Sequence, residues 1–294
     1  MLSTISTNNS ITASFMQVFT TVSETQKQIE NWQSNGLKIG FVPTMGALHA
    51  GHISLVKQSL EDNDRTVVSV FVNPNQFNNA ADLEKYPRTF DRDSEMLRDV
   101  GVDLMFFPSV NEIYPTPDIR KFDFGDLEKV MEGEHRPGHF NGVAQVVSRL
   151  FEIVMPDNAY FGEKDFQQLA IINAMVKQLA LKVKIVPCTI LREANGLAMS
   201  SRNERLNTTD RENAKVIYET LKQAKEELAT NGVEVVKKKA IERLNSSGFL
   251  KAEYLEISEA ESLKAANKIE AGLNYIICLA VWLGDVRLID NVRA

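Results

Sequence analysis

Short apolar runs alternate with amphipathic stretches along the first two thirds of the chain. The runs are apolar at consecutive positions, as in strands buried on both faces, and the stretches between them repeat apolar residues at helical spacing. This alternation is typical of a parallel sheet with helices on both sides. It predicts strands within 38–44, 66–74, 102–109, 158–165 and 182–193, and helices within 52–63, 91–101, 140–154 and 166–180.

The pattern changes after about residue 192. Helix-start chemistry at Thr209 and Asp210 and a stop at Gly232 predict one helix, and 233–248 predicts a second. Three strands are expected after them, and a turn at Gly284 and Asp285 indicates an antiparallel hairpin between the last two. The predicted strands lie within 252–260, 275–284 and 286–292.

We therefore expect an α/β fold with two domains. A Rossmann-like doubly wound parallel sheet occupies 16–190, and a smaller α+β domain with an antiparallel sheet occupies 191–294. The first fifteen residues are rich in Ser, Thr and Asn, which predicts a disordered extension. A chain of 294 residues is long enough for this division and for a large core.

Composition narrows the function classes. The formal net charge of -6 argues against a nucleic-acid or membrane surface, which needs a basic patch. No apolar run approaches the roughly 18 residues of a membrane span, and 1–15 resembles neither a secretory signal nor a mitochondrial presequence. Cys188 and Cys278 lie in apolar strand-like runs, so we expect buried thiols rather than a disulfide or zinc site. We expect a cytoplasmic enzyme.

Residues 43–52 read "PTMGALHAGH" and join a predicted strand to a predicted helix. Ligands bind at this position in open α/β sheets, and the free N–H groups of a helix N-terminus suit phosphate. Gly46 and Gly51 allow close approach of backbone and ligand, and His49 and His52 can face one ligand together. Their imidazole N–H groups, neutral or protonated, could then donate to phosphoryl oxygens. The alternative is a glycine-rich turn with two surface histidines. The position at a strand-to-helix junction favours phosphate binding.

The segment "LAMSSRNERL" lies where the first domain gives way to the second. Ser200, Ser201 and Arg202 are good phosphate partners, although alone they would more readily indicate a helix N-cap with a solvated arginine. Combined with the HxGH-type motif, they resemble the mobile KMSKS-like loop of nucleotidyltransferases in the class I aminoacyl-tRNA synthetase superfamily.

The segment "YFGEKDFQQL" occupies the same topological position as the first motif, between a strand and a helix. Lys164 could reach phosphates, and Asp165 could cap the helix or contact a ribose or a metal. A capped helix with an exposed charge run explains the spacing equally well. In "VNPNQF", Asn73 and Gln76 could bind hydroxyls or a carboxylate, or simply make a loop polar.

A further candidate segment is "GEHRPGHFNGV". Its Arg136 and His139 precede a helix whose start could face the same cleft. Two polar residues at the surface are an equally good interpretation.

Together these segments resemble the pantoate–β-alanine ligase (pantothenate synthetase) family. The matching motifs are "FVPTMGALHAGH", "FVNPNQF" with "DLEKYPRT", "RPGHFNGV", "YFGEKDFQQL" and "GLAMSSRN", in the family's order, and the resemblance extends from about Met16 to the C-terminus. The departures, Asn75 and Asn141, fall at positions without an assigned chemical role. The first fifteen residues have no counterpart.

The resemblance implies ATP-dependent condensation of (R)-pantoate with β-alanine through a pantoyl adenylate, with release of pyrophosphate and AMP. It implies a homodimer, Mg²⁺, and a C-terminal domain that closes as a lid over the nucleotide. His52 would be a proton donor, and Gln76 would contact pantoate and β-alanine, with Gln168 on pantoate. The catalytic set would be His49, His52, Lys164 and Arg202. The ATP site would comprise Met45, Gly46, Ala47, Leu48, His49, Ala50, Gly51, His52, Gly162, Glu163, Lys164, Asp165, Leu191, Met199, Ser200, Ser201 and Arg202.

The residue types suit this chemistry, because adenylation needs positioning and neutralisation of charge more than a protein nucleophile. We expect both histidines, Lys164, Arg202 and Mg²⁺ to supply positive charge; the metal ligands are not identified. Other HxGH nucleotidyltransferases, such as cytidylyltransferases, lack the paired glutamines. A non-catalytic nucleotide sensor would have lost one of the four catalytic residues, and a tRNA-binding role conflicts with the acidic balance.

Overall fold

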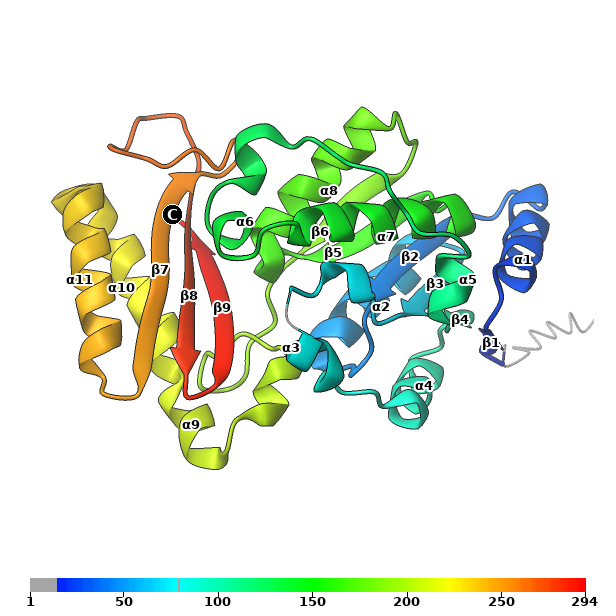
Figure 1. Cartoon of the computed structure of the whole chain (residues 1–294), viewed down its shortest axis with the longest axis horizontal. Coiled ribbons are helices and arrows are strands. Elements are labelled where there is room, and N and C mark those ends of the chain that lie inside the picture. Colours follow the sequence, from blue (N-terminus) through cyan, green and yellow to red (C-terminus); the bar gives the residue numbers. More distant parts are fainter. Residues whose placement is uncertain (1–14, 79) are drawn as a thin grey trace, which may run out of the picture.

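The computed structural model describes residues 15–78 and 80–294, so the predicted extension over 1–15 lies outside the described residues except at its last position. The described chain forms a six-stranded sheet and a three-stranded sheet side by side (Figure 1). The strands are β1 Gln17–Phe19, β2 Ile39–Thr44, β3 Arg65–Val70, β4 Leu104–Phe106, β5 Asn158–Gly162, β6 Lys184–Cys188, β7 Leu250–Glu259, β8 Tyr275–Leu283 and β9 Val286–Arg293. The α-helices are α1 Val22–Ser34, α2 Ala50–Asp62, α3 Ala80–Glu84, α4 Phe90–Asp99, α5 Val110–Ile113, α6 Glu132–His135, α7 His139–Val154, α8 Phe166–Gln178, α9 Thr208–Asn213, α10 Lys215–Asn231 and α11 Val233–Ser246.

Successive residues of the parallel strands enter two different cores. Phe41 of β2 packs in the core formed with α1, α7 and α8, whereas Val42 packs with α2 and α4 on the opposite face. Ala159 and Tyr160 of β5 divide in the same way. Both faces of β2 and of β5 are therefore dry, which is why these two strands read as continuous apolar runs in the sequence.

The strand order is β1-β4-β3-β2-β5-β6, and every pair in this sheet is parallel. The chain moves from β2 toward one edge, and then returns to place β5 against the other side of β2. The topological switch point therefore lies between β2 and β5, where open sheets bind ligands. The predicted Rossmann-like class, with an additional antiparallel sheet, is confirmed.

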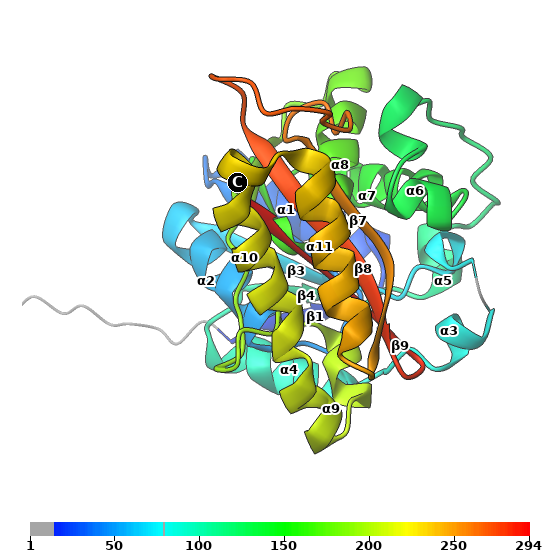
Figure 2. The ribbon, with the colours of Figure 1, turned by 90° about the vertical axis from the view of Figure 1, so that its left-hand side faces the viewer.

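The C-terminal sheet has the order β7-β8-β9 and is antiparallel. Helices α10 and α11 cover its outer face (Figure 2), while Ile276 and Cys278 of β8 point the other way and pack with Met131 and Phe166. The predicted hairpin at 284–285 is confirmed. The domain boundary at residue 191 stays a prediction, although one apolar core draws only on residues from Leu197 onward.

The helix predicted over 208–232 is instead two helices. The first begins one residue after Asn207, whose side chain accepts the N–H of Asp210 at 2.8 Å, so the start is not capped by Thr209 or Asp210. The break falls at Ala214, and Gly232 ends α10 with a positive φ of 75°. The pattern also did not predict β1, α1, α3, α5 and α6, which are short or largely polar segments.

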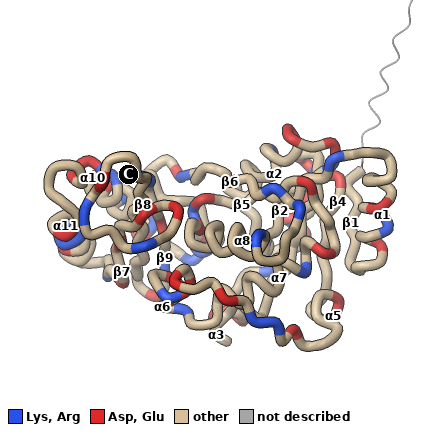
Figure 3. The backbone as a smooth tube through the Cα atoms, turned by 90° about the horizontal axis from the view of Figure 1, so that it is seen from above, with Lys and Arg blue, Asp and Glu red and all other residues tan. Residues whose placement is uncertain are grey.

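Charged residues of both signs are interspersed along the two halves of the chain (Figure 3). The two cysteines are free and buried, and burial raises the pKa of the Cys188 thiol to about 11. Across 15–78 and 80–294, no helix is both long and apolar enough to cross a membrane.

Candidate active site

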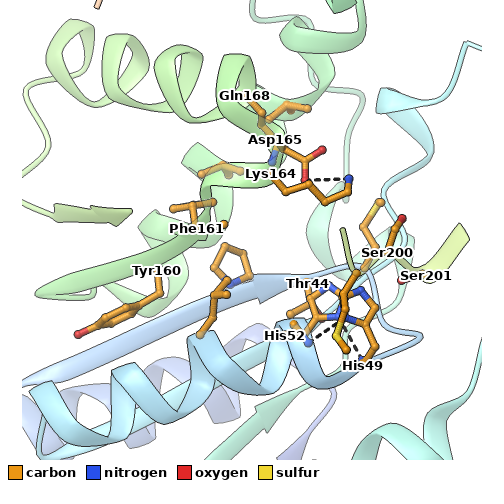
Figure 4. A pocket seen from close by; sticks show the side chains of 18 of the residues that line it. Thr44, His49, His52, Tyr160, Phe161, Lys164, Asp165, Gln168, Ser200 and Ser201 are labelled. Carbon is orange, nitrogen blue, oxygen red and sulfur yellow. Dashed lines mark hydrogen bonds and ion pairs between the residues drawn. The ribbon is translucent and has the colours of Figure 1, made fainter. Parts of the chain in front are cut away.

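A cleft opens at the carboxyl ends of β2 and β5, and the connection that follows β6 closes it on one side (Figure 4). Four segments far apart in the sequence meet in it: the turns after β2, β3 and β5 and the connection that follows β6. Most of the predicted site residues line it, namely Met45, His49, Gly51, His52, Gln76, Gly162, Lys164, Asp165, Gln168, Leu191, Met199, Ser200, Ser201 and Arg202. Gly46, Ala47, Leu48, Ala50 and Glu163 are not among the lining residues.

The two histidines cap the first turn of α2. His49 is the N-cap, and its Nδ1 accepts the N–H of Gly51 at 3.1 Å. The N–H of His49 reaches Nδ1 of His52 at 3.4 Å, and the ring centroids lie 4.0 Å apart. An Nδ1 that accepts a hydrogen bond carries no proton, so each neutral ring holds its proton on Nε2. The cap therefore leaves each ring with one N–H donor, on Nε2.

Burial is the main cause of the low pKa of both rings. It lowers the pKa of His49 to about 4, helped by Lys164. It lowers the pKa of His52 to about 3, with further contributions from His49 and Lys164. Of the neutral and protonated forms, this structure favours the neutral one for both histidines. Burial penalises the charged form, and the cap hydrogen bonds need an unprotonated Nδ1, so both effects favour neutral rings that donate through Nε2.

The backbone between β2 and α2 is held by a carboxylate from α4. Gly46 and Ala47 both adopt positive φ, 79° and 48°. The N–H of Ala47 donates to Asp93 Oδ2 at 2.9 Å, and the N–H of Leu48 donates to Asp93 Oδ1 at 2.8 Å. Asp93 is 1% exposed, so Gly46, Ala47 and Leu48 shape the loop from behind rather than form the cleft surface.

The turn after β5 is a short 3₁₀ helix, Glu163–Asp165. Lys164 Nζ lies 3.7 Å from Asp165 Oδ2, and the lysine side chain is 16% exposed. Both face the cleft with Gln168 of α8 (Figure 4). Glu163 instead pairs with Arg293 of β9 at 2.5 Å, so its carboxylate is already occupied.

Gln76 is buried at the end of the 3₁₀ helix Pro74–Gln76. Its Nε2 lies 2.8 Å from Met45 Sδ, and its Oε1 accepts from Asn73 Nδ2 at 3.1 Å. Arg136 and His139 lie behind it: Nδ1 of His139 donates to the Gln76 carbonyl at 2.8 Å. These two residues line a smaller neighbouring cavity instead of the main cleft. Both contact the carbonyl of Gln76, so they hold its backbone in place from outside the cleft.

The segment after β6 closes the cleft from the C-terminal side. Ser200 caps the 3₁₀ helix Ser201–Arg205, accepting from the N–H of Arg202 at 3.3 Å. Ser201 Oγ donates to the carbonyl of Ala47 at 3.0 Å, which joins this segment to the loop after β2. Arg202 is held at the rim by Asp82 of α3, at 3.3 Å. Ser200 is therefore an N-cap, as one interpretation had it, while Arg202 is paired with Asp82 and not simply solvated. The segment also lines the cleft, and its binding of phosphate stays a prediction.

Some cleft residues were not predicted from the sequence. Tyr86 lines the wall beside Arg202, and an apolar stripe of α7 forms the floor. That stripe has the spacing i, i+3, i+4, i+7, which also describes any core-facing helix, so the sequence carried no signal that distinguished it. It comprises Val143, Val146, Val147 and Leu150.

Within the residues that the structure describes, no group of three or more His, Cys, Asp or Glu side chains could hold a metal ion. Asp165 is a carboxylate that lines the cleft. Mg²⁺ often takes one or two protein carboxylates and completes its octahedron with water and substrate phosphates. One carboxylate at this position fits a Mg²⁺ ion whose other ligands are water and substrate phosphates.

Comparison with known proteins adds a family. Residues 17–293 match the family model described as pantoate-beta-alanine ligase. Pantothenate synthetase of Bacteroides thetaiotaomicron is 51% identical over 278 residues, covering 95% of this chain and 99% of the relative. Pantothenate synthetase of Porphyromonas gingivalis strain W83 is 49% identical with the same coverage of both chains.

Solved structures agree in fold over nearly the whole length. The crystal structure of pantothenate synthetase from Thermus thermophilus is 40% identical, with a TM-score of 0.86, and covers 94% of this chain and 99% of that one. Pantoate-beta-alanine ligase from Francisella tularensis, described as complexed with "Beta-gamma ATP and Beta-alanine", is 39% identical with a TM-score of 0.80, covering 94% and 97%.

Proposed function

The chain belongs to the pantoate–β-alanine ligase family, and from this membership we propose that it joins pantoate to β-alanine through a pantoyl adenylate formed from ATP. Formation of pantothenate is the activity of the family. The route through an adenylate, with release of pyrophosphate and then AMP, is our proposal for this chain. The observation that carries it is the meeting of neutral imidazole donors, two cationic side chains and two carboxamides in one cleft.

In the first step, a carboxylate oxygen of pantoate attacks the α-phosphorus of ATP and pyrophosphate departs in line. Charge accumulates on phosphoryl oxygens, so preorganised donors and cations stabilise the transition state. Nε2–H of His49 and of His52 would donate to these oxygens. Lys164 and Arg202 would neutralise the leaving pyrophosphate, and Gln76 and Gln168 would hold pantoate for attack.

In the second step, the amine of β-alanine attacks the acyl carbon of the adenylate, the bond to AMP breaks, and the amine loses a proton. An acyl adenylate also reacts with water, so water must be excluded. The contact between Ser201 and the Ala47 carbonyl supports this role, because it joins the C-terminal segment to the nucleotide-binding loop across the cleft. We propose that the 191–294 domain acts as a lid.

ATP would enter as its Mg²⁺ complex, with Asp165 as the carboxylate from this chain that the ion meets. The ion would offset phosphate charge when bound. The described residues supply no cage of their own, which is consistent with a metal that enters and leaves with the nucleotide.

An omission assay tests the reaction. Purified protein with MgATP, pantoate and β-alanine should form AMP and pantothenate. Without β-alanine, one pyrophosphate per site should appear as a burst; without pantoate, none should appear. Equal AMP formation in the absence of pantoate would show that the acid is not being activated, and the proposal would fail.

His52→Ala tests the site. Removal of one Nε2–H donor should lower the rate of adenylation about 100-fold or more, by analogy with the loss of an oxyanion donor. Circular dichroism should show a folded protein, since His52 contributes a single long hydrogen bond to the cap. Normal pyrophosphate release by the folded variant would contradict the assigned role. A homodimer in the cytoplasm follows only from the family resemblance and stays a prediction.

A further inference from the structure

The last strand of the chain reaches the turn that carries Lys164. Asn291 of β9 is 4% exposed, and its Nδ2 donates to the carbonyl of Glu163 at 2.8 Å and to that of Lys164 at 2.9 Å. We propose that Asn291 is a positioning residue, which makes the placement of Lys164 depend on the seating of the C-terminal sheet. This inference rests on the role proposed above for Lys164.

The turn needs support from outside because it has little of its own. It is a single 3₁₀ turn of three residues, and its N-cap, Gly162, has no side chain to cap it. Asp165, at the start of α8, makes no side-chain cap bond either. Hydrogen-bond geometry in 3₁₀ turns is poorer than in α-helices. The two hydrogen bonds from Asn291 therefore add support from outside to a short turn that has no side-chain cap of its own.

Strand alternation explains why a residue 127 positions away points at this turn. Side chains on a strand alternate between faces. In β9, Arg287, Asn291 and Arg293 lie on the face toward the larger sheet, where Arg287 pairs with Glu132 at 2.7 Å. Arg293 reaches Glu163 at 2.5 Å, so two side chains of this face hold the same turn.

The residue before Asn291 secures it from the other face. Asp290 is 3% exposed and binds Arg192 through two contacts of 2.6 and 2.9 Å. Its Oδ1 also accepts the N–H of Asn291 at 2.8 Å, and Arg192 donates to the Asn291 carbonyl at 3.1 Å. Arg192 lies in the connection after β6 that leads into Ser200 and Arg202. The end of β9 is thereby tied both to that connection and to the Lys164 turn.

A single displacement of the C-terminal sheet would therefore act on two cationic groups. Arg202 would move with its own segment, and the carbonyls of Glu163 and Lys164 would lose their donor. Lys164 reaches its working position only when the sheet is seated over the cleft. This coupling would keep the lysine from stabilising phosphate charge while the site is still open to water.

A double-mutant cycle tests the coupling. We would measure pre-steady-state pyrophosphate release, and the KM values for ATP and β-alanine, in the parent, Asn291→Ala, Lys164→Ala and the double variant. Displacement of the turn by a fraction of an ångström predicts about a ten-fold lower adenylation rate for Asn291→Ala. The KM for β-alanine should be unchanged. In the Lys164→Ala background the same change should cost less than about two-fold, because residues that act as a unit are non-additive.

Tyr254→Phe is the matched control. It removes one hydrogen bond across the same interface, of 2.9 Å to Glu132, and leaves the hydrogen bonds of Asn291 to the Lys164 turn in place. Its effect should be small and equal in both backgrounds. Asn291→Asp places a carboxylate oxygen against two carbonyls in a nearly isosteric side chain, and should be slower than Asn291→Ala, so it serves if the alanine variant does not fold.

Three results would overturn the coupling. Equal losses from Asn291→Ala in the two backgrounds would show a general loosening of the interface. Asn291→Asp with a normal adenylation rate would show that the two carbonyls do not need the donor. Full activity of Lys164→Ala would remove the lysine from the chemistry, a failure of the proposed function that the single variant distinguishes from a failure of the coupling.

Discussion

Replacement of Asp93 should cost both stability and adenylation. Its carboxylate accepts from the N–H groups of Ala47 and Leu48 at 2.9 and 2.8 Å, and from Thr89 Oγ1 at 3.1 Å. Ala47 and Leu48 are 8% and 1% exposed, so water cannot readily replace the acceptor. The carboxylate also maintains the positive φ at Ala47, a conformation that costs of order 1 kcal/mol or more outside glycine.

The size of the effect follows from the number of N–H groups left without an acceptor. Asp93→Asn keeps one oxygen and turns the other into a donor, so one N–H is orphaned, at about 1–3 kcal/mol. Asp93→Ala orphans both, and we expect a loss of about 4 kcal/mol after allowance for the buried charge that is also removed. His49 directly follows this loop, so a shift of the loop backbone would displace its imidazole. We therefore expect adenylation to fall about 100-fold in either variant.

The loss of stability is measured by urea unfolding, followed by the fluorescence of Trp32. The experiment uses a Trp282→Phe background, so that Trp32, which is buried, is the one remaining tryptophan. The loss of adenylation is measured by pyrophosphate release. Asp91→Asn is the matched control, since Asp91 lies on the same helix and is exposed; it should change stability by less than about 0.5 kcal/mol. If Asp93→Asn behaves like this control in both assays, the carboxylate does not hold the loop and the reasoning is refuted.

Two further predictions concern the histidine cap. In Gly51→Ala the new Cβ would lie 2.8 Å from His49 Cε1 and 3.3 Å from Met199 Cβ. We therefore expect a displaced imidazole and at least a ten-fold loss of adenylation, with a Tm close to that of the parent. An unchanged adenylation rate would count against the tight packing around Gly51. Burial holds the pKa of His49 and His139 at about 4 and that of His52 at about 3, below the ordinary 6.5. The unfolded chain therefore binds these protons first: stability is fully present above pH 6.5, and falls by about 1.4 kcal/mol per pH unit for each histidine as the pH drops toward 4. Urea midpoints between pH 7 and pH 5 check this, and a midpoint that does not fall would refute the neutral assignment.

Much of the fold could be read from the sequence, because strands that are dry on both faces leave an unmistakable pattern. The runs at 38–44 and 158–165 each predicted a strand followed by a ligand-binding turn, and the structure confirms both strands. Short or polar elements gave no such pattern: β1 is three residues long and exists by pairing with β4, and the break at Ala214 falls inside a continuous amphipathic stretch.

The candidate site was predicted as a set of residue types rather than as a geometry. The types were visible, since His49, His52 and Lys164 stand out where predicted strands meet helices, and Arg202 at the predicted domain junction. Their electrostatic state was not. The sequence left neutral and protonated histidines open, whereas burial and the N-cap favour neutral donors, and neither effect can be read from a motif.

What the sequence determined by itself is therefore local: strand and helix positions, the glycine-bearing turns, and the family that these motifs resemble. Tertiary structure decided which of these turns share a cleft, because the order of β2 and β5 in the sheet depends on long-range pairing. It also decided which residues outside the cleft hold the backbone of the cleft loops. Asp93 and Asn291 act through buried hydrogen bonds to the backbone of distant loops. Every residue type except proline has the same backbone N–H and C=O groups, so the sequence cannot show which backbone group a side chain will bind.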